Sequence, residues 1–181
     1  APLARELSYG VLRWYSRLQA LAALLLKQPL KAKDQDVQLL ILIGLYQCLE
    51  LRMPPHAAVA TAVEASRGLK KPWASGMINA VLRRLLRERE ELLAKADSTP
   101  SGRYAHPRWL IRHYQSAWPN DWEALLLANN TRPPMTLRVN HRLGSTTDYL
   151  ALLKEAGISA QALEWSADTL LLDSPLAVER L

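Results

Sequence analysis

Apolar residues recur at helical spacing over most of the first hundred positions. Near the start, five of them follow one another at steps of three, four or seven residues: Leu3, Leu7, Val11, Leu18 and Leu21. This spacing predicts an amphipathic helix, which Pro29 limits. Residues 37–51 are apolar almost all round, as is typical of a helix surrounded by others. Together the two patterns predict a helical bundle with residues 37–51 at its centre.

Prolines and glycines divide the rest of this bundle. Pro54 and Pro55 predict a new helix start, because proline fits the first helical turn but not the interior. The alanine-rich residues 56–67 form that helix, and Gly68 is expected to end it. Ser75 is expected to cap a further helix that reaches about Ala96.

Residues 97–102 (DSTPSG) have the composition of a linker, since they combine capping residues, proline and glycine with no apolar side chain. Beyond them, residues 107–117 and 122–129 predict two shorter helices. Residues 135–140 alternate apolar and polar positions, which indicates a strand. A helix over residues 146–156 and a second strand at 169–172 are expected to follow.

The predicted fold class is therefore mainly α: a helical bundle, then short helices and the start of a small α+β subdomain. We expect a helical domain over residues 1–97, a helical connector over 98–132, and the α+β subdomain over 133–181. The 181 residues are enough for a sizeable core.

The charge is positive and unevenly distributed. The formal net charge is +6; residues 1–99 carry 15 Lys and Arg against 9 Asp and Glu, and residues 146–181 carry 2 against 6. A basic domain of this kind favours nucleic acid as a partner. One cysteine, Cys48, fits a reducing cytoplasm, and no apolar stretch reaches the roughly 20 residues of a membrane span. No histidine pair has metal-ligand spacing, and no glycine-rich turn follows a strand, so neither a metal site nor a cofactor site is expected.

Arginines gather on one side of the helix that starts at Ser75. At about 100° per residue, its apolar residues cover one half of the helix, and Arg83, Arg84 and Arg87 lie on the other. Three basic residues just upstream extend this cluster: Arg67, Lys70 and Lys71. The set could contact a phosphate backbone, although an ordinary solvated helix face explains the charge as well.

Other basic and aromatic residues are weaker candidates for RNA contacts. Arg13 and Arg17 lie on the polar side of the first helix, and Arg138 on the polar side of the expected strand. Trp73 lies beside the upstream lysines, where an exposed ring could stack on an unpaired base. Core packing for the ring and plain solvent exposure for the charges are the alternative interpretations.

Four segments resemble, in order and spacing, the RNA-binding domain of the NusB antitermination family. They are residues 6–13 (ELSYGVLR), 45–47 (LYQ), 54–59 (PPHAAV) and 78–84 (INAVLRR). Three further segments resemble the joining region of the methyltransferase B (Sun or Fmu) family of ribosomal RNA small-subunit methyltransferases. These are residues 106–110 (HPRWL), 129–130 (NN) and 133–140 (PPMTLRVN).

This resemblance implies a NusB-like bundle that positions 16S ribosomal RNA for a downstream domain. That domain would use S-adenosylmethionine to methylate carbon 5 of a cytosine through a cysteine thiolate. The resemblance places the catalytic cysteines and the cofactor beyond Leu181, so this chain is expected to bind RNA but not to react, and Cys48 takes neither role. It also implies a further basic helix before Ala1, and the methyltransferase domain itself as a partner. The alternative is a NusB-like module that acts in transcription antitermination.

Overall fold

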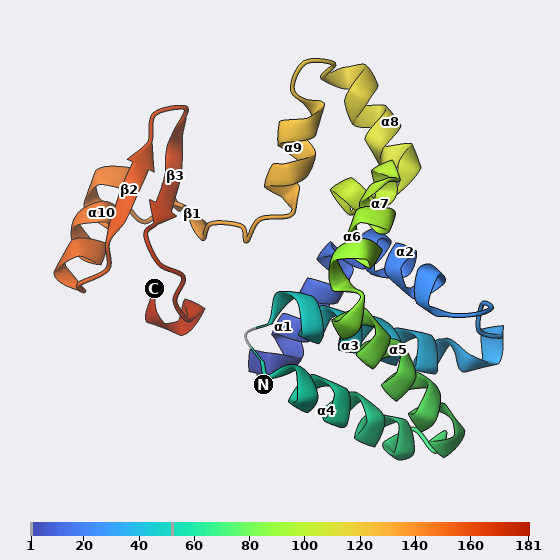
Figure 1. Cartoon of the computed structure of the whole chain (residues 1–181). Coiled ribbons are helices and arrows are strands. Elements are labelled where there is room, and N and C mark those ends of the chain that lie inside the picture. The colour runs from blue at the N-terminus through green and yellow to red at the C-terminus, as the bar shows by residue number, and fades with distance from the viewer. Residues whose placement is uncertain (1, 52) are drawn as a thin grey trace. The chain divides into compact units, whose positions relative to one another are not determined.

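The structure is a computed structural model that describes residues 2–51 and 53–181, and it is mainly helical, as the sequence predicts. It separates into two compact units, Ala1–Asn130 and Thr131–Leu181. The first unit contains the helices α1 (Pro2–Arg13), α2 (Tyr15–Leu25), α3 (Gln35–Glu50), α4 (Pro55–Gly68), α5 (Ser75–Arg87), α6 (Arg89–Asp97), α7 (Pro100–Tyr104), α8 (Arg108–Ala117) and α9 (Trp122–Asn129), with the 3-10 turns η1 (Ala32–Asp34) and η2 (Pro72–Ala74) (Figure 1).

Helix α3 is the centre of the bundle, as predicted. It packs against α1, α2, α4 and α5, and nine of its residues are buried. Several of the largest fully buried side chains in this unit come from it and its neighbours: Leu18, Leu21, Ile41, Leu42, Leu45, Ile78, Leu82 and Leu85. Burial of apolar surface at about 25 cal/mol per Å² makes this core the main stabilising feature of the unit.

A glycine allows α1 and α3 to approach closely. A Cβ atom added to Gly10 would lie 2.0 Å from the ring of Tyr46, so only glycine fits opposite this tyrosine. The Tyr46 hydroxyl donates a hydrogen bond to the Glu6 carboxylate at 2.8 Å. Burial, with this carboxylate second, raises the pKa of Tyr46 to about 12. The tyrosine therefore stays neutral and joins the two helices.

Two helices that the pattern predicts as continuous are each broken once. The chain leaves helical geometry at Trp14, between α1 and α2, and at Glu88, between α5 and α6. Apolar periodicity continues across both breaks, because each pair of helices still turns its apolar side toward the bundle. Each break changes only the backbone conformation, and the spacing of apolar side chains gives no sign of it.

The predicted helix ends around α4 and α5 are also corrected. Gly68 is the last residue of α4, and the left-handed residue that follows is Lys70, with φ of 57°. Ser75 is the first residue of α5 and makes no capping hydrogen bond. Its hydroxyl lies 2.7 Å from the hydroxyl of Ser66, which is fully buried. The serine therefore joins α4 to α5.

The segment expected to be a linker is partly helical. Thr99 caps α7 by accepting a hydrogen bond from the backbone N–H of Gly102 at 3.2 Å. A Cβ atom on Gly102 would lie 1.9 Å from the Ala96 carbonyl oxygen, so this residue must be glycine. Helix α7 packs against α2 and α6, which makes it part of the first unit. Helices α8 and α9 follow within one residue of their predicted bounds.

The second unit is a small α+β fold. Strands β1 (Thr136–Arg138) and β2 (Ala160–Leu163) pair antiparallel with the central β3 (Ser166–Leu172), and α10 (Thr146–Glu155) packs against β2 and β3. Ser145 and Asp148 form a reciprocal capping box at the start of α10. The buried core consists of Val139, Leu153, Leu170 and Leu172. The predicted strands β1 and β3 and the helix are confirmed, and β2 was not predicted.

Candidate nucleic-acid interface

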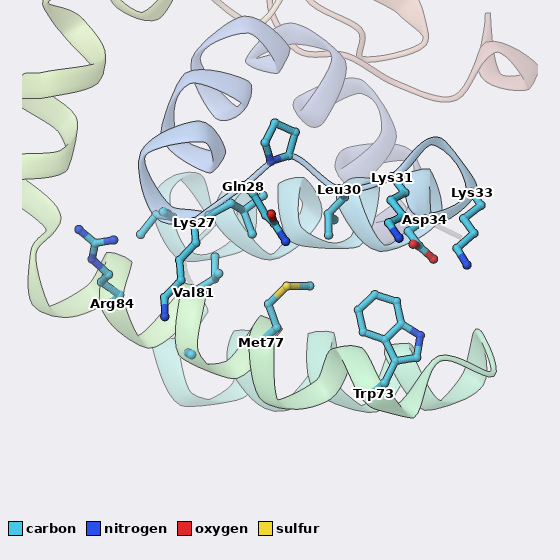
Figure 2. Close-up of a pocket in the computed structure, with 14 residues that line it drawn as sticks. Lys27, Gln28, Leu30, Lys31, Lys33, Asp34, Trp73, Met77, Val81 and Arg84 are labelled. Carbon is cyan, nitrogen blue, oxygen red and sulfur yellow. The ribbon is translucent and has the colours of Figure 1, made fainter.

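A basic groove lies in the first unit between the segment that joins α2 to α3 and one face of α5. Its volume is about 800 Å³, and four cationic side chains line it, against one carboxylate: Lys27, Lys31, Lys33 and Arg84, against Asp34. Figure 2 shows Arg84 and Lys27 toward one end, with Trp73, Lys31 and Lys33 at the other. Among the described residues, none of the three lysines forms an ion pair. We call this surface the basic groove.

Apolar side chains lie between the two basic ends. Leu30 and Met77 face each other across the middle of the groove, and Val81 lies beside them (Figure 2). The Trp73 side chain, 55% exposed, stands at the end near Lys31 and Lys33. An apolar floor with cations at both ends suits a ligand that has flat, weakly polar rings and negative charge, such as unpaired RNA.

Lys71 fixes the wall of the groove. Its ammonium lies 3.0 Å from the Asp34 carboxylate and 2.6 Å from that of Asp36, and it donates to the Lys33 carbonyl at 2.9 Å. Hydrogen bonds to Asp36 and then Asp34 raise the pKa of Lys71, and the bond from Lys71 lowers the pKa of Asp36. Lys71 was predicted as an RNA contact, and the structure instead places it against two carboxylates, where it compensates the one acidic residue of the groove.

The three predicted arginines of α5 lie in different settings. Arg84 lines the basic groove, donates to Glu88 at 2.8 Å and reaches the Leu24 carbonyl at 3.3 Å. Arg87 is exposed and lies 3.4 Å from the same carboxylate. The hydrogen bond from Arg84 is the main cause that lowers the pKa of Glu88. One carboxylate therefore partly compensates both cations.

Arg83 faces a different hollow from Arg84. It donates to the Asn79 side chain at 2.9 Å and, with that residue, lines a hollow between α4 and α5. Arg67 is exposed and pairs with Glu64 at 2.9 Å, and Lys70 is exposed. The three residues thus lie at the surface of the first unit but outside the basic groove.

Arg17 and Lys71 are both largely enclosed, with side chains 21% and 20% exposed. Arg17 pairs with Asp97 at 2.7 Å, which joins α2 to the end of α6. The guanidinium also lies 5.8 Å from the centre of the Trp14 ring. Arg13 is half-buried, and Arg138 belongs to the second unit, where it is 86% exposed and 3.3 Å from Asp168. The predicted residues therefore do not gather into one patch.

Sequence reasoning missed the three lysines of the basic groove. Lys27, Lys31 and Lys33 lie within seven positions and flank Pro29, a density of charge that marks an exposed, non-helical segment. The sequence gives no direct sign that α5 lies opposite this segment, because the two are about fifty residues apart. The charge run was the available signal.

No three His, Cys, Asp or Glu side chains among the described residues gather as a metal site requires. No helix in residues 2–51 and 53–181 is long and apolar enough to cross a membrane. Burial raises the pKa of the Cys48 thiol, so it is protonated at neutral pH and suited to packing.

Two family models match the chain. The NusB family matches residues 1–87, and the ferredoxin-like domain described as methyltransferase RsmF/B-like matches residues 106–179. The first match covers the bundle from α1 to α5, and the second covers α8, α9 and the whole second unit except its last two residues.

Several relatives carry the same name, ribosomal RNA small subunit methyltransferase B. The protein from Pseudomonas putida is 53% identical over 94% of this chain, that from Pseudomonas syringae pv. tomato 49% identical over 99%, and that from Vibrio cholerae 43% identical over 99%. The chain spans 39%, 40% and 41% of the length of these three relatives.

A solved structure, titled Crystal Structure of PH0851, shares the fold. It has a TM-score of 0.69 and 14% sequence identity, and the match covers 98% of this chain and 41% of that one. At this identity the likeness concerns the fold alone.

Proposed function

Residues 1–87 of this chain belong to the NusB family and residues 106–179 to the ferredoxin-like domain of RsmF/B-like methyltransferases, and from this premise we propose an RNA-binding role. The chain is the N-terminal part of a 16S ribosomal RNA cytosine carbon-5 methyltransferase and positions the RNA for methylation. It works in the cytoplasm, with 16S ribosomal RNA and its own downstream methyltransferase domain as partners.

The observation that carries this proposal is the basic groove. Its three lysines have no carboxylate partner among the described residues, so their charge is available to phosphates. The apolar floor and the exposed Trp73 ring add surfaces on which unpaired bases can rest. Relatives named as ribosomal RNA methyltransferases support RNA as the polyanion.

The cofactor belongs to the downstream domain in this proposal. S-adenosylmethionine supplies the methyl group, and a cysteine of that domain attacks the base. None of the described strands leads through a glycine-rich turn into a helix, the feature that binds such cofactors in α/β folds. In this proposal, this chain's own residues bind and orient RNA, and methyl transfer belongs to the downstream domain.

We also propose a division of labour along the chain. Residues 1–97 hold the RNA through the basic groove, residues 98–132 connect the two parts and can add contacts to RNA, and residues 133–181 lead into the methyltransferase domain. The arginines of α5 contribute to RNA binding from outside the groove or, for Arg84, from its end. Lys70, Arg67 and Arg138 are exposed and remain proposed contacts.

Antitermination is the second candidate, because the NusB family match by itself fits that role. The match of residues 106–179 to a methyltransferase domain favours the first candidate. Copurification of an elongation-complex protein, with no methyl transfer by the full-length protein, would support antitermination instead.

The test combines binding and catalysis. We expect the chain to bind 16S ribosomal RNA fragments with an affinity that falls as salt rises, and replacing Lys27, Lys31 and Lys33 with Ala to lower the salt slope by about three. In the full-length protein the same change should lower kcat/KM for methylation of the ribosomal RNA. Unchanged binding and methylation in the triple variant would refute the proposal. Replacing Lys154, which lies in the second unit outside all of these residues, is the matched control.

A further inference from the structure

A second, smaller pocket lies in the first unit, away from the basic groove. Its volume is about 470 Å³, and its walls come from the end of α1, the start of α2, the turn between α7 and α8, and the end of α9. Three segments with distant sequence positions meet there, represented by Arg13, His106 and Asn130. All three belong to motifs that the sequence comparison with known families singled out, and the proposed function gives them no task.

The turn at this pocket is held in an unusual backbone conformation. Ala105 is buried and has φ of 56°, a left-handed geometry that costs a non-glycine residue about 1 kcal/mol or more. The Tyr104 carbonyl accepts hydrogen bonds from the Nδ2 atom of Asn130, at 2.9 Å, and from Nδ1 of His106. The fold therefore tolerates strain in order to hold these two side chains at the pocket.

These hydrogen bonds determine what the two side chains can offer a ligand. A carbonyl oxygen only accepts, so Asn130 must turn its amide nitrogen toward it and keep Oδ1 as an acceptor. In the same way, His106 carries its proton on Nδ1 when neutral, which leaves Nε2 as an acceptor. In the described part of the chain neither of these two acceptors has a partner. The pocket wall is thus suited to N–H donors of a ligand.

Arg13, at the end of α1, supplies positive charge to the pocket. The residue is half-buried, and no carboxylate of the described residues lies within ion-pair distance of it. A guanidinium that forms no ion pair has donors available to a ligand, and a phosphate group matches their forked geometry. This is the reverse of Arg17, four residues later, which is already paired with Asp97.

Apolar surface completes the pocket. Tyr15 lines it with a ring that is 37% exposed, and its hydroxyl accepts a hydrogen bond from Gln19 at 2.8 Å, which holds the ring in place. Leu12 lies on the same wall and is 69% exposed. A ring held in this way can stack on a planar base at little entropic cost.

We propose that this pocket binds one unpaired RNA nucleotide, with a phosphate on Arg13, the base against Tyr15, and the base edge toward Asn130 and His106. The two acceptors favour adenine, cytosine or guanine, whose exocyclic amino group offers two N–H donors, over uracil, which offers the single donor of N3–H. This inference rests on the proposed RNA-binding function and adds a selective subsite to the charge-driven basic groove.

The test compares two RNA hexamers, one of cytidine and one of uridine, whose bases differ at position 4 (amino group against carbonyl) and at N3 (acceptor against N–H donor). We expect the intact chain to bind the cytidine hexamer about fivefold more tightly in fluorescence anisotropy, as one added base contact allows. His106→Ala should reduce this preference to about twofold or less. Arg13→Gln should weaken both hexamers and lower the salt slope by about one, and Arg13→Lys should restore most of the loss.

The control is the Lys27, Lys31 and Lys33 triple variant, which should weaken both hexamers and keep the preference. Equal binding of the two hexamers by the intact chain, or no change in Arg13→Gln and His106→Ala, would overturn the pocket and leave the proposed function standing. Failure of the intact chain to bind any ribosomal RNA fragment would instead overturn the proposed function. Circular dichroism of each variant separates loss of the site from loss of the fold.

Discussion

The basic groove and the junction between α2 and α6 use positive charge in opposite ways. In the groove, Lys27, Lys31 and Lys33 have no carboxylate partner among the described residues. At the junction, Arg17 is largely enclosed and lies 2.7 Å from Asp97, a residue 80 positions away in the sequence. Basic side chains are therefore available to a ligand in one region and hold two helices together in the other, and the presence of a nearby carboxylate makes the difference.

Glu88 and Lys71 represent intermediate cases. Glu88 lies between Arg84 and Arg87 and compensates part of the charge of both. Lys71 is paired with Asp34 and Asp36. Because it compensates the Asp34 carboxylate that lines the groove, the groove keeps its net positive charge. Experiments that separate binding from stability can test each assignment.

The largest effect is expected for Arg17→Ala. It would leave the Asp97 carboxylate partly enclosed without its partner and lower the free energy of unfolding by about 2 kcal/mol. The loss stays at this level because Arg17 Nε and Asp97 Oδ1 have no partner in the described part of the chain, so the pair is incompletely satisfied. Urea denaturation measures the change. RNA affinity of the folded variant should stay within about twofold, and a large loss of affinity would show that Arg17 belongs to the interface.

The next effect concerns Trp73. Trp73→Ala should weaken binding of single-stranded RNA about tenfold, because stacking of one base on an aromatic ring contributes roughly 1–3 kcal/mol. Trp73→Phe, which keeps a ring, should lose much less. The ring is 55% exposed, so the unfolding transition should hardly move. Equal binding of RNA by the Ala and Phe variants would show that base stacking at position 73 does not contribute to affinity.

A smaller effect is expected for the arginines of α5. Replacing Arg83, Arg84 and Arg87 with Ala should weaken RNA binding about fivefold, and the salt slope should fall by less than three because Glu88 already compensates two of them. Glu88→Gln is the informative counterpart, since it frees both cations and should strengthen binding about twofold. Weaker binding by Glu88→Gln would mean that the pairing positions these arginines for RNA.

The smallest effect concerns pH and Lys71. The pKa of Asp36 is lowered below its ordinary value of 3.8, so the stability it contributes is present above that value and is lost as pH falls through the folded-state pKa. The pKa of Lys71 is raised above 10.5, so its contribution is lost only as pH rises beyond that value. In Lys71→Met the midpoint of thermal unfolding should fall less on acidification from about pH 6 to pH 3 than in the unaltered chain. Parallel curves for the two proteins would contradict this account of Lys71.

Sequence patterns predicted most helices because apolar spacing reports which side of a helix meets the core. They did not predict the breaks at Trp14 and Glu88, where the spacing continues although the backbone turns. Helix α7 was not predicted because its sequence is polar and contains proline and glycine. The Thr99 cap and packing against α2 stabilise it. Strand β2 contains two alanines and only one larger apolar residue, so its alternation is weak.

For the candidate site, the sequence indicated where positive charge lies, but not which of these cations are paired with a carboxylate in the fold. Arg84 does line the basic groove, whereas Lys71 and Arg17 are held by carboxylates that only the fold brings near. Ion pairs between residues 35 or 80 positions apart depend on tertiary packing, which local spacing does not describe. The lysines between α2 and α3 were passed over because they lie in a segment without periodicity.

The two ends of the basic groove are held by contacts of different strength. Near Trp73, Lys71 contacts Asp36 of α3 at 2.6 Å and Asp34 of η1 at 3.0 Å, whereas at the other end Arg84 donates a longer hydrogen bond of 3.3 Å to the Leu24 carbonyl. We therefore expect the groove to open more readily at its Arg84 end than beside Trp73. In the proposed function, a single RNA strand would then enter at the Arg84 end and place a base on Trp73 at the more firmly held end.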